Sequence, residues 1–395
     1  MLLDLLQFGR APRFRLPLKS IAALLFISAA LAGCQSDDMA EDAPKDTKLK
    51  PPPSLVEETF GRGNIEITLM MAKAPNGYYD ATGRDIRDGA ALAVGELDDG
   101  SLMKIKVVDL AAGPAAVAPA VAAARARNAA MIITYAPQAT VAALAAIPAD
   151  QRPMILNLAQ PIVAPQVFNF EIDEVESAAR GARSAIASGR KKIALLAPSG
   201  FSTPNEDRLR RLIGQAGGAL SGVVRYDAGA IALTDLLAAN KALLADAGAA
   251  IVMGDGGGVG LAVKGLRASY PQLTIIGTSS WPQQIYTEPA AANVIIAAFD
   301  PEGTGLIGER YYRFNRRPLS VYAAYGYDSV GIVAGIVRGQ GGGALTPDAL
   351  TNKTGFRGVT GLFRFAKSGA LERKIGLYKI DGGHLTPLEP KPAGF

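Results

Sequence analysis

Cysteine and histidine are almost absent from this sequence, since its 395 residues contain 1 of each. One cysteine cannot form a disulfide within the chain, and the pair cannot supply a histidine-bearing zinc site, a Ser-His-Asp triad or a Cys-His pair. The histidine, His384, lies in the segment DGGHL, which predicts the far side of a hairpin turn and favours a solvated side chain over a catalytic base. We therefore expect no enzymatic activity, no bound metal and no cofactor.

Long apolar runs are also missing, because no segment reaches the roughly 20 residues that a membrane-spanning helix needs. An almost unbroken apolar run covers residues 21–32 and follows a basic start with Arg10, Arg13, Arg15 and Lys19. This layout is typical of a bacterial export signal. Without residues 1–33 the chain has 37 basic and 35 acidic residues, so its net charge falls from +5 to +2. Such a balance gives no reason to expect nucleic-acid binding.

The segment Leu31-Ala32-Gly33-Cys34 resembles the lipobox of bacterial lipoproteins, in which the cysteine sulfur receives a diacylglycerol before cleavage. The resemblance implies that residues 1–33 are a lipoprotein signal peptide and that Cys34 is the lipidated first residue of the mature chain. Two or three acyl chains anchor a protein stably to a bilayer. Gln35 stands where an aspartate would signal retention in the inner membrane. We therefore expect a lipid-anchored protein of the cell envelope that faces the periplasm, with the outer membrane favoured over the inner.

The segment 34–63 is rich in charge and contains three consecutive prolines. It has too few apolar residues to form a core, so it is predicted to be a disordered tether. Its 29 residues after Cys34 would span about 30 Å on average and about 100 Å when fully stretched. The folded part can therefore stand well away from its membrane.

From residue 65 onward, short apolar runs alternate with small-residue loops and alanine-rich stretches of helical spacing. The runs form two successive blocks: IEITLMM, MKIKVVDL, MIITY, PMILNL and VFNF, followed by KKIALLAP, LSGVVRYD, AAIVMGD and LTIIGTS. This alternation predicts an α/β protein with two doubly wound parallel sheets. After NVIIAAFD, helices are predicted over 305–315 and 320–338, and a two-strand hairpin is predicted to turn at Ser368-Gly369.

The segments YAAYGYDSVGIVAGIV and FRGVTGLFRFAKSGALERKIGLYKI resemble the late helix and closing hairpin of the type I periplasmic binding fold, as in leucine/isoleucine/valine-binding proteins. The resemblance covers about residues 64–390 and implies two lobes joined by three crossovers. Lobe 1 would take 64–173 plus 298–354, and lobe 2 would take 174–297 plus 355–395. The segments LTIIGTSSWPQQIYTEPAAANVIIAAFDPEG and RYYRFNRRPLSVYAAYGYDSV resemble the branch of penicillin-binding-protein activator lipoproteins.

The ligand cleft of such a fold lies beyond the carboxyl ends of the parallel strands. The loops that follow the predicted strands therefore nominate the candidate cleft residues: Asn76, Tyr78, Tyr135, Gln138, Asn157, Gln160, Ser199, Ser202, Asp255, Ser279, Ser280 and Trp281. For Trp281, contact with a ligand or between lobes and simple core filling are both open.

Leucine-type relatives hold an amino acid's carboxylate with backbone amides and Ser/Thr hydroxyls on the third and fourth loops, and its ammonium with an acid of lobe 2. Here the third loop, TYAPQAT, has Pro137 without an N–H and no Ser/Thr pair at its tip, and the fourth, LNLAQPI, has no Ser/Thr. Asp255 is the acid that lobe 2 offers. An unpaired charge in a closed cleft costs several kcal/mol, so capture of a standard amino acid is disfavoured.

Two further segments have competing interpretations. GDGGGVG at residues 254–260 follows a strand and precedes a helix, but it lacks the GK[ST] ending and the GxGxxG spacing, so a tight turn is favoured over nucleotide binding. A helix end carries Tyr311, Tyr312, Arg313, Phe314, Arg316 and Arg317. Inward packing of the aromatics with basic residues at the helix C-terminus is favoured over a partner surface.

Two hypotheses about function remain. In the first, favoured by the activator resemblance, the chain is a non-enzymatic regulator that docks on a penicillin-binding protein. In the second, it is the solute-binding lipoprotein of an ABC importer and delivers a small ligand, an amino acid or a related compound, to a permease. The tether and the lipid anchor are compatible with both hypotheses, whereas the polar groups of the cleft distinguish between the two.

The lipobox leads to a direct prediction. Mass spectrometry of the protein extracted from bacterial envelopes should find a chain that begins at Cys34 and carries added acyl mass, because the signal peptidase cleaves before the modified cysteine. An N-terminus without acyl mass would contradict the lipobox interpretation.

Overall fold

The computed structural model describes residues 58–97, 101–171, 173–227, 233–338 and 341–395. The predicted signal peptide, Cys34 and the tether up to residue 57 lie outside these ranges. Within them, no helix is both long enough and apolar enough to cross a membrane.

Lobe 1 is built on a six-stranded sheet, here sheet A, with the order β1-β3-β2-β4-β5-β6. All neighbours pair in parallel except β1, which runs antiparallel to β3. β1 lies in the segment 34–63 that was predicted to be a disordered tether, so the end of that segment is instead part of the sheet. The apolar runs of the sequence become these strands with small shifts at their ends. The strands are β1 (Thr59–Gly61), β2 (Ile65–Met71), β3 (Met103–Asp109), β4 (Met131–Tyr135), β5 (Met154–Asn157) and β6 (Val167–Asn169).

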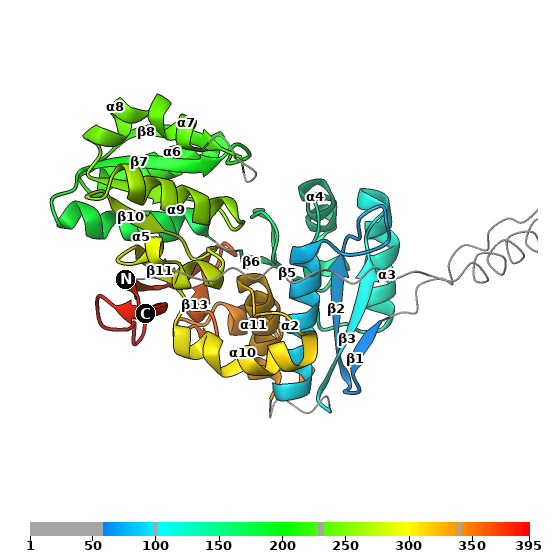
Figure 1. The fold of residues 1–395 in the computed structure, drawn as a ribbon. Coiled ribbons are helices and arrows are strands. Elements are labelled where there is room, and N and C mark those ends of the chain that lie inside the picture. The colour runs from blue at the N-terminus through cyan, green and yellow to red at the C-terminus, as the bar shows by residue number, and fades with distance from the viewer. Residues whose placement is uncertain (1–57, 98–100, 172, 228–232, 339–340) are drawn as a thin grey trace, which may run out of the picture. The chain divides into compact units, whose positions relative to one another are not determined.

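Helices cover both faces of sheet A (Figure 1). One face packs against α2 (Ala81–Leu97) and against α11 (Val321–Val337), which arrives from much later in the chain. The other face packs against α3 (Val117–Ala126) and α4 (Gln138–Ala146). Short 3-10 turns, η1 (Gly113–Ala116) and η2 (Ala149–Gln151), complete the connections.

Lobe 2 is built on a seven-stranded sheet, sheet B, with the order β16-β15-β11-β10-β9-β7-β8. The strands β7 to β11 pair in parallel, as the second block of runs predicts, and β15 and β16 add antiparallel at one edge. The strands are β7 (Lys192–Pro198), β8 (Ala219–Tyr226), β9 (Ala249–Val252), β10 (Thr274–Gly277), β11 (Ile295–Ala298), β15 (Gly376–Asp381) and β16 (His384–Pro387).

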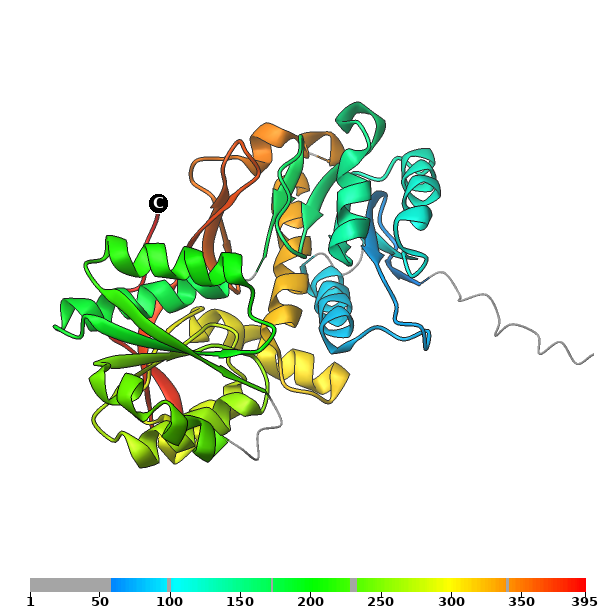
Figure 2. The ribbon, with the colours of Figure 1, turned by 90° about the horizontal axis from the view of Figure 1, so that it is seen from above.

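Sheet B is also covered on both faces (Figure 2). α5 (Glu174–Ala187) and α6 (Thr203–Gln215) pack on one face. The other face receives α7 (Leu233–Ala239), α8 (Lys241–Asp246) and α9 (Gly258–Ser269), with η3 (Gln283–Thr287) and η4 (Pro289–Ala291) beside them. The doubly wound architecture predicted from the sequence is therefore confirmed for both lobes.

A third, three-stranded sheet C differs from the predicted two-strand hairpin. Strands β13 (Gly361–Phe365) and β14 (Leu371–Lys374) form the hairpin, and β12 (Phe356–Gly358) pairs with β13 on its outer side. Phe363 and Phe365 pack in the same core as Phe168 and Phe170 of lobe 1, whereas the chain joins sheet B only from β15. The buried aromatic side chains attach the hairpin to lobe 1. This packing is a reason to place the last crossover near Ile375 and not between residues 354 and 355, where the lobe boundary was predicted.

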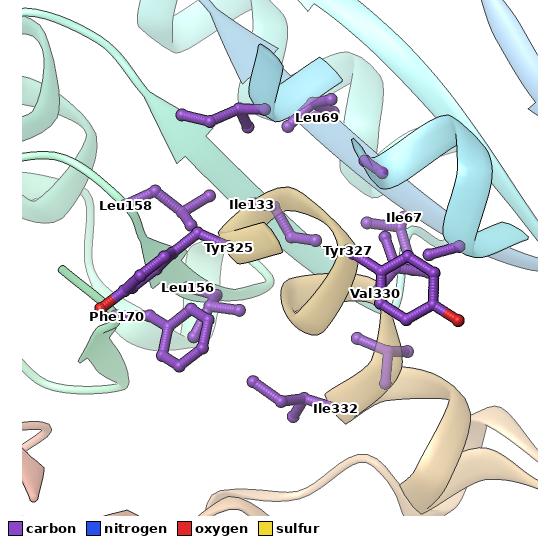
Figure 3. Packing of buried hydrophobic residues seen from close by; sticks show 14 of the residues in the cluster. Ile67, Leu69, Ile133, Leu156, Leu158, Phe170, Tyr325, Tyr327, Val330 and Ile332 are labelled. Atoms are coloured by element: carbon purple, nitrogen blue, oxygen red, sulfur yellow. The ribbon is translucent and has the colours of Figure 1, made fainter. Parts of the chain in front are cut away.

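Helix α11 makes its contact with α2 through two glycines. A Cβ on Gly89 would lie 1.9 Å from the carbonyl oxygen of Ala323, and a Cβ on Gly326 would lie 2.1 Å from that of Ile86. The two backbones therefore touch, and the apolar side chains around this contact fill the core of lobe 1 (Figure 3). The remaining helices of this part are α10 (Pro301–Asn315), η5 (Gly342–Ala344) and α12 (Pro347–Leu350).

Arg373 lies where the three crossovers between the lobes meet. Its guanidinium carbon is 5.1 Å from the ring centre of Phe170 and 5.3 Å from that of Phe299, which begin the first two crossovers. Arg373 itself begins the third. The rings of Tyr325 and Phe363 lie 4.9 and 5.0 Å away. Its Nη1 also donates to the Thr360 carbonyl oxygen at 2.9 Å.

The glycine contact leads to a prediction about stability. Gly326→Ala should lower the free energy of unfolding by about 3 kcal/mol, because its methyl group must push α11 away from α2. Gly335→Ala is the matched control, since it lies in the same helix with no atom within 4 Å of its added Cβ. That change should be neutral or stabilising by up to about 1 kcal/mol. Equal effects in urea denaturation would contradict the packing described here.

Candidate functional site

Asp255 and Tyr322 connect the two lobes by a hydrogen bond. Asp255 follows β9 of lobe 2, and Tyr322 lies in the first turn of α11, whose start is fixed by the Ser320 side chain accepting from the Ala323 N–H. The Tyr322 hydroxyl donates to Asp255 Oδ2 at 3.0 Å. Burial and the nearby Asp255 carboxylate raise the pKa of Tyr322, so the hydroxyl keeps its proton and remains a donor.

Tyr135 brings the end of β4 to the same place. Burial raises the pKa of Tyr135, and the carboxylates of Asp80 and Asp255 raise it further. Asp80 immediately precedes α2, and its Oδ1 accepts from the Gly83 N–H at 2.6 Å. Acids of both lobes therefore act on this one phenol.

Glu174 organises the strand ends of lobe 2. It is the first residue of α5, directly after the first crossover. Its Oε1 accepts from the Gly254 N–H at 2.8 Å, from Thr278 Oγ1 at 2.9 Å and from Ser280 Oγ at 2.6 Å. One carboxylate oxygen thus fixes the loops that follow β9 and β10.

Trp281 is a core residue at the edge of this site. It is 3% exposed, and its Nε1 donates to the Val252 carbonyl oxygen at 2.8 Å. A Cβ on Gly277 would lie 3.0 Å from the indole ring, so the glycine gives the ring its space. These contacts favour core filling, although the residue also lines the cavity described next.

A cavity of about 800 Å³ lies between these elements. Lobe 2 contributes Asp255, the segment 279–287 and the tip of the β15–β16 hairpin, where His384 stands after Gly382 and Gly383 as predicted. Lobe 1 contributes the first turn of α2, part of α10 and the first turn of α11. Among the described residues of its walls, none is Lys or Arg. Asp85, one of two acids there, is paired with Arg317.

A second cavity, of about 900 Å³, lies elsewhere. It is walled by α10, α11 and sheet C, and at its rim Lys391 Nζ pairs with Asp300 and Glu302 at 3.1 and 2.9 Å. None of the twelve candidate cleft residues lines it, so the cavity beside Asp255 is the candidate site.

The structure separates the twelve candidates into groups. Asp255, Ser279, Ser280 and Trp281 line the candidate cavity. Asn157 is buried and donates to the Asn169 Oδ1 at 3.0 Å, so its amide serves the interior of lobe 1. The others do not line the cavity: Tyr135 lies near Asp255, and Asn76, Tyr78, Gln138, Gln160, Ser199 and Ser202 are exposed on the loops at the strand ends.

The aromatic and basic residues at the end of α10 divide between inward packing and a partner surface. Tyr311 is fully buried and bonds to Asp85, and Arg317 binds both Asp85 and Asp88, which is the inward packing that was favoured. Tyr312 and Phe314 instead are 53% and 73% exposed.

The glycine-rich segment 254–260 forms a turn from β9 into α9, with Gly254 at φ 120°. Nowhere in the described ranges do three or more His, Cys, Asp or Glu side chains group as metal ligands would.

Sequence reasoning did not find Glu174 and Tyr322. Glu174 looks like an ordinary acidic residue in the first turn of a helix, and Tyr322 belongs to an apolar helix. The available signal is position, because each residue lies in the first turn of a helix, and the helix of Glu174 directly follows the first crossover.

Two doubly wound lobes, three crossovers and a cavity with walls from both lobes define a type I binding fold. The chain belongs to the periplasmic binding protein family: the profile of that family matches residues 67–384. The fold is leucine-binding-like, as the comparison with solved structures also shows. A search of the curated proteins finds no match.

Three solved structures illustrate the similarity of fold. A putative branched-chain amino acid ABC transporter protein from Rhodospirillum rubrum is 18% identical, with 82% of this chain and 99% of that chain covered and a TM-score of 0.65. A solute-binding protein of R. palustris in complex with benzoate is 16% identical, with 82% and 96% covered and a TM-score of 0.61. A leucine-binding protein of Thermotoga maritima is 15% identical, with 82% and 98% covered and a TM-score of 0.58.

The role of Glu174 can be tested through the single tryptophan of the chain. Glu174→Ala should lower the free energy of unfolding by about 1–3 kcal/mol, because three donors lose their acceptor. It should also shift the emission of Trp281 to the red as water reaches the loop after β10. Glu176→Ala in the same turn is the control, since the Glu176 carboxylate pairs with the partly exposed Arg183 and none of the hydrogen bonds to the loops after β9 and β10 depends on it. It should cost less than about 1 kcal/mol and leave the emission unchanged.

Proposed function

We propose that the chain is the lipid-anchored solute receptor of an ABC importer, which captures a small molecule between its lobes and delivers it to a permease. The observation that carries this proposal is the cavity of about 800 Å³, whose walls come from both lobes and whose polar groups include the Asp255–Tyr322 pair. Ligand pockets of this size between two lobes are typical of proteins that close on a solute. Such a receptor performs no covalent chemistry and needs no cofactor.

The comparisons support the receptor over the penicillin-binding-protein activator that the sequence favoured. The solved structures described above include an ABC transporter protein, a solute-binding protein with a bound benzoate and a leucine-binding protein. Neither these neighbours nor the curated proteins supply a relative with an activator role. The receptor is therefore the better supported of the two hypotheses.

The anchor at Cys34 is part of the proposal and has a geometric consequence. A tethered receptor can dock on a permease only within reach of its tether, about 100 Å at full stretch. The importer hypothesis thus favours an anchor in the membrane that holds the permease, whereas Gln35 favours the outer membrane. Fractionation of the two membranes separates these alternatives.

A pull-down tests the partner. The full-length protein, cross-linked in envelopes and then solubilised, should recover the membrane subunits of an ABC importer, because solute delivery requires contact with them. Recovery of a peptidoglycan synthase in place of a permease would contradict the receptor and support the activator. Cys34→Ser is a useful control, since it should release the protein from the membrane without changing its binding of small molecules.

A further inference from the structure

Three donors at the strand ends of lobe 2 are occupied by the chain itself. In doubly wound folds an anionic ligand is held by backbone N–H groups and hydroxyls at this edge. Here the Gly254 N–H and the hydroxyls of Thr278 and Ser280 all point to Oε1 of Glu174, at 2.6 to 2.9 Å. A ligand carboxylate would have to displace a carboxylate that is covalently part of the protein.

The strand ends of lobe 1 show the same use of donors. Asp109 Oδ1 accepts from the N–H groups of Lys73 and Ala111 at 3.1 and 2.9 Å. Asn157 Oδ1 accepts from the Ala159 N–H at 3.0 Å, and the loop after β4 contains Pro137, which has no N–H. Side chains of lobe 1 itself therefore accept from backbone N–H groups on the loops after β2, β3 and β5.

Lys73 is the single basic residue in the sequence of the loops after β2, β3, β4, β5, β7, β9 and β10. Its ammonium lies 5.2 Å from the ring centre of Tyr79 and does not line the candidate cavity. His384 lines the cavity from the tip of the β15–β16 hairpin, where it is exposed. An anion in the cavity would therefore meet no Lys or Arg side chain among the described residues of its walls, and the three donors that Glu174 holds would not be free to bind it.

Acceptors, in contrast, are available in the cavity. The Asp255 carboxylate is exposed, and the Tyr322 hydroxyl is the one hydrogen-bond donor that it has among the described residues. The other acid, Asp85, is neutralised by Arg317 and bonded to Tyr311. Asp255 therefore sets the charge of the site, and its effect on the pKa values of Tyr135 and Tyr322 shows that both phenols lie in its field.

The walls next to this charge are apolar and aromatic. Phe299, Leu319, Val321, Tyr286 and Trp281 all line the cavity. An ammonium group beside an acid is also attracted to aromatic faces, and an apolar body attached to it would bury surface against such walls.

We infer that this cleft takes a small cationic solute, a primary amine on an apolar or aromatic body, and rejects carboxylates of the same shape. The amine pairs with Asp255 and donates to the oxygens around it. The inference rests on the proposed receptor function, because it names the class of solute for that same cavity.

Pairs of molecules with similar shape and different charge test the inference. Calorimetry, with Trp281 fluorescence as a second readout, should compare the cation benzylamine with the anion benzoate, and 3-methylbutylamine with 3-methylbutanoate. A third pair, leucinol and leucine, keeps the ammonium and adds a carboxylate. We expect each amine to bind at least about 10-fold tighter than its carboxylate partner. Asp255→Asn should weaken amine binding by at least about 10-fold and change the melting temperature little, because the asparagine oxygen can still accept from the Tyr322 hydroxyl.

Asp246→Asn is the matched control, since it removes an acid of lobe 2 that pairs with Lys192 at the surface. It should leave amine binding unchanged. A carboxylate or a neutral polyol that binds tighter than the amines would overturn the inference while leaving the receptor function in place. If no amine, carboxylate, polyol or amino acid binds, the receptor function fails together with the inference.

Discussion

The backbone contact between α2 and α11 is the constraint on which the rest of the structure depends. Gly89 and Gly326 let two helices from distant parts of the chain touch, and this contact fixes the rotation of α11 about its axis. Three side chains on successive turns then have defined roles. Tyr322 reaches Asp255, and Tyr325 donates to the Glu171 carbonyl oxygen at the first crossover. Asp328 accepts from the N–H groups of Val359 and Thr360, in the turn between β12 and β13 of sheet C. One helix thus connects the cleft, the crossover and the closing hairpin.

The sequence predicts the fold well where the signal is local. β2 and β4 have the bounds of the apolar runs IEITLMM and MIITY, because buried parallel strands are continuous apolar segments between loops. It fails where partners are chosen over long distances. β1 has only three residues and no alternation to detect, and β15 leaves the hairpin to pair Tyr378 with Ile296 of sheet B. The run IGLYKI would alternate in the same way in either sheet, so its pattern cannot select between them.

The position of the candidate site was predictable in part, and the orientation of its side chains was not. The rule that ligands bind at the carboxyl ends of parallel strands nominated twelve residues, of which Asp255 and the segment 279–281 line the cavity. The same rule placed Asn157 at the right edge, but its side chain turns inward to Asn169. Glu174 was missed because its three donors come from residues about 80 to 106 positions away, and no local pattern encodes that convergence. Position therefore follows from topology, whereas orientation depends on hydrogen-bond partners that only the folded chain reveals.

The setting of Arg373 has a mechanical consequence. Attraction between a guanidinium and an aromatic face changes gradually with the angle between them, whereas a hydrogen bond weakens steeply when it bends. Rings at the start of the first two crossovers face this cation, which itself begins the third, and among the described residues Thr360 is its hydrogen-bond partner. The three linkers therefore share one side chain whose ring contacts tolerate small changes of angle, and a substitution of Arg373 would act on all three at once.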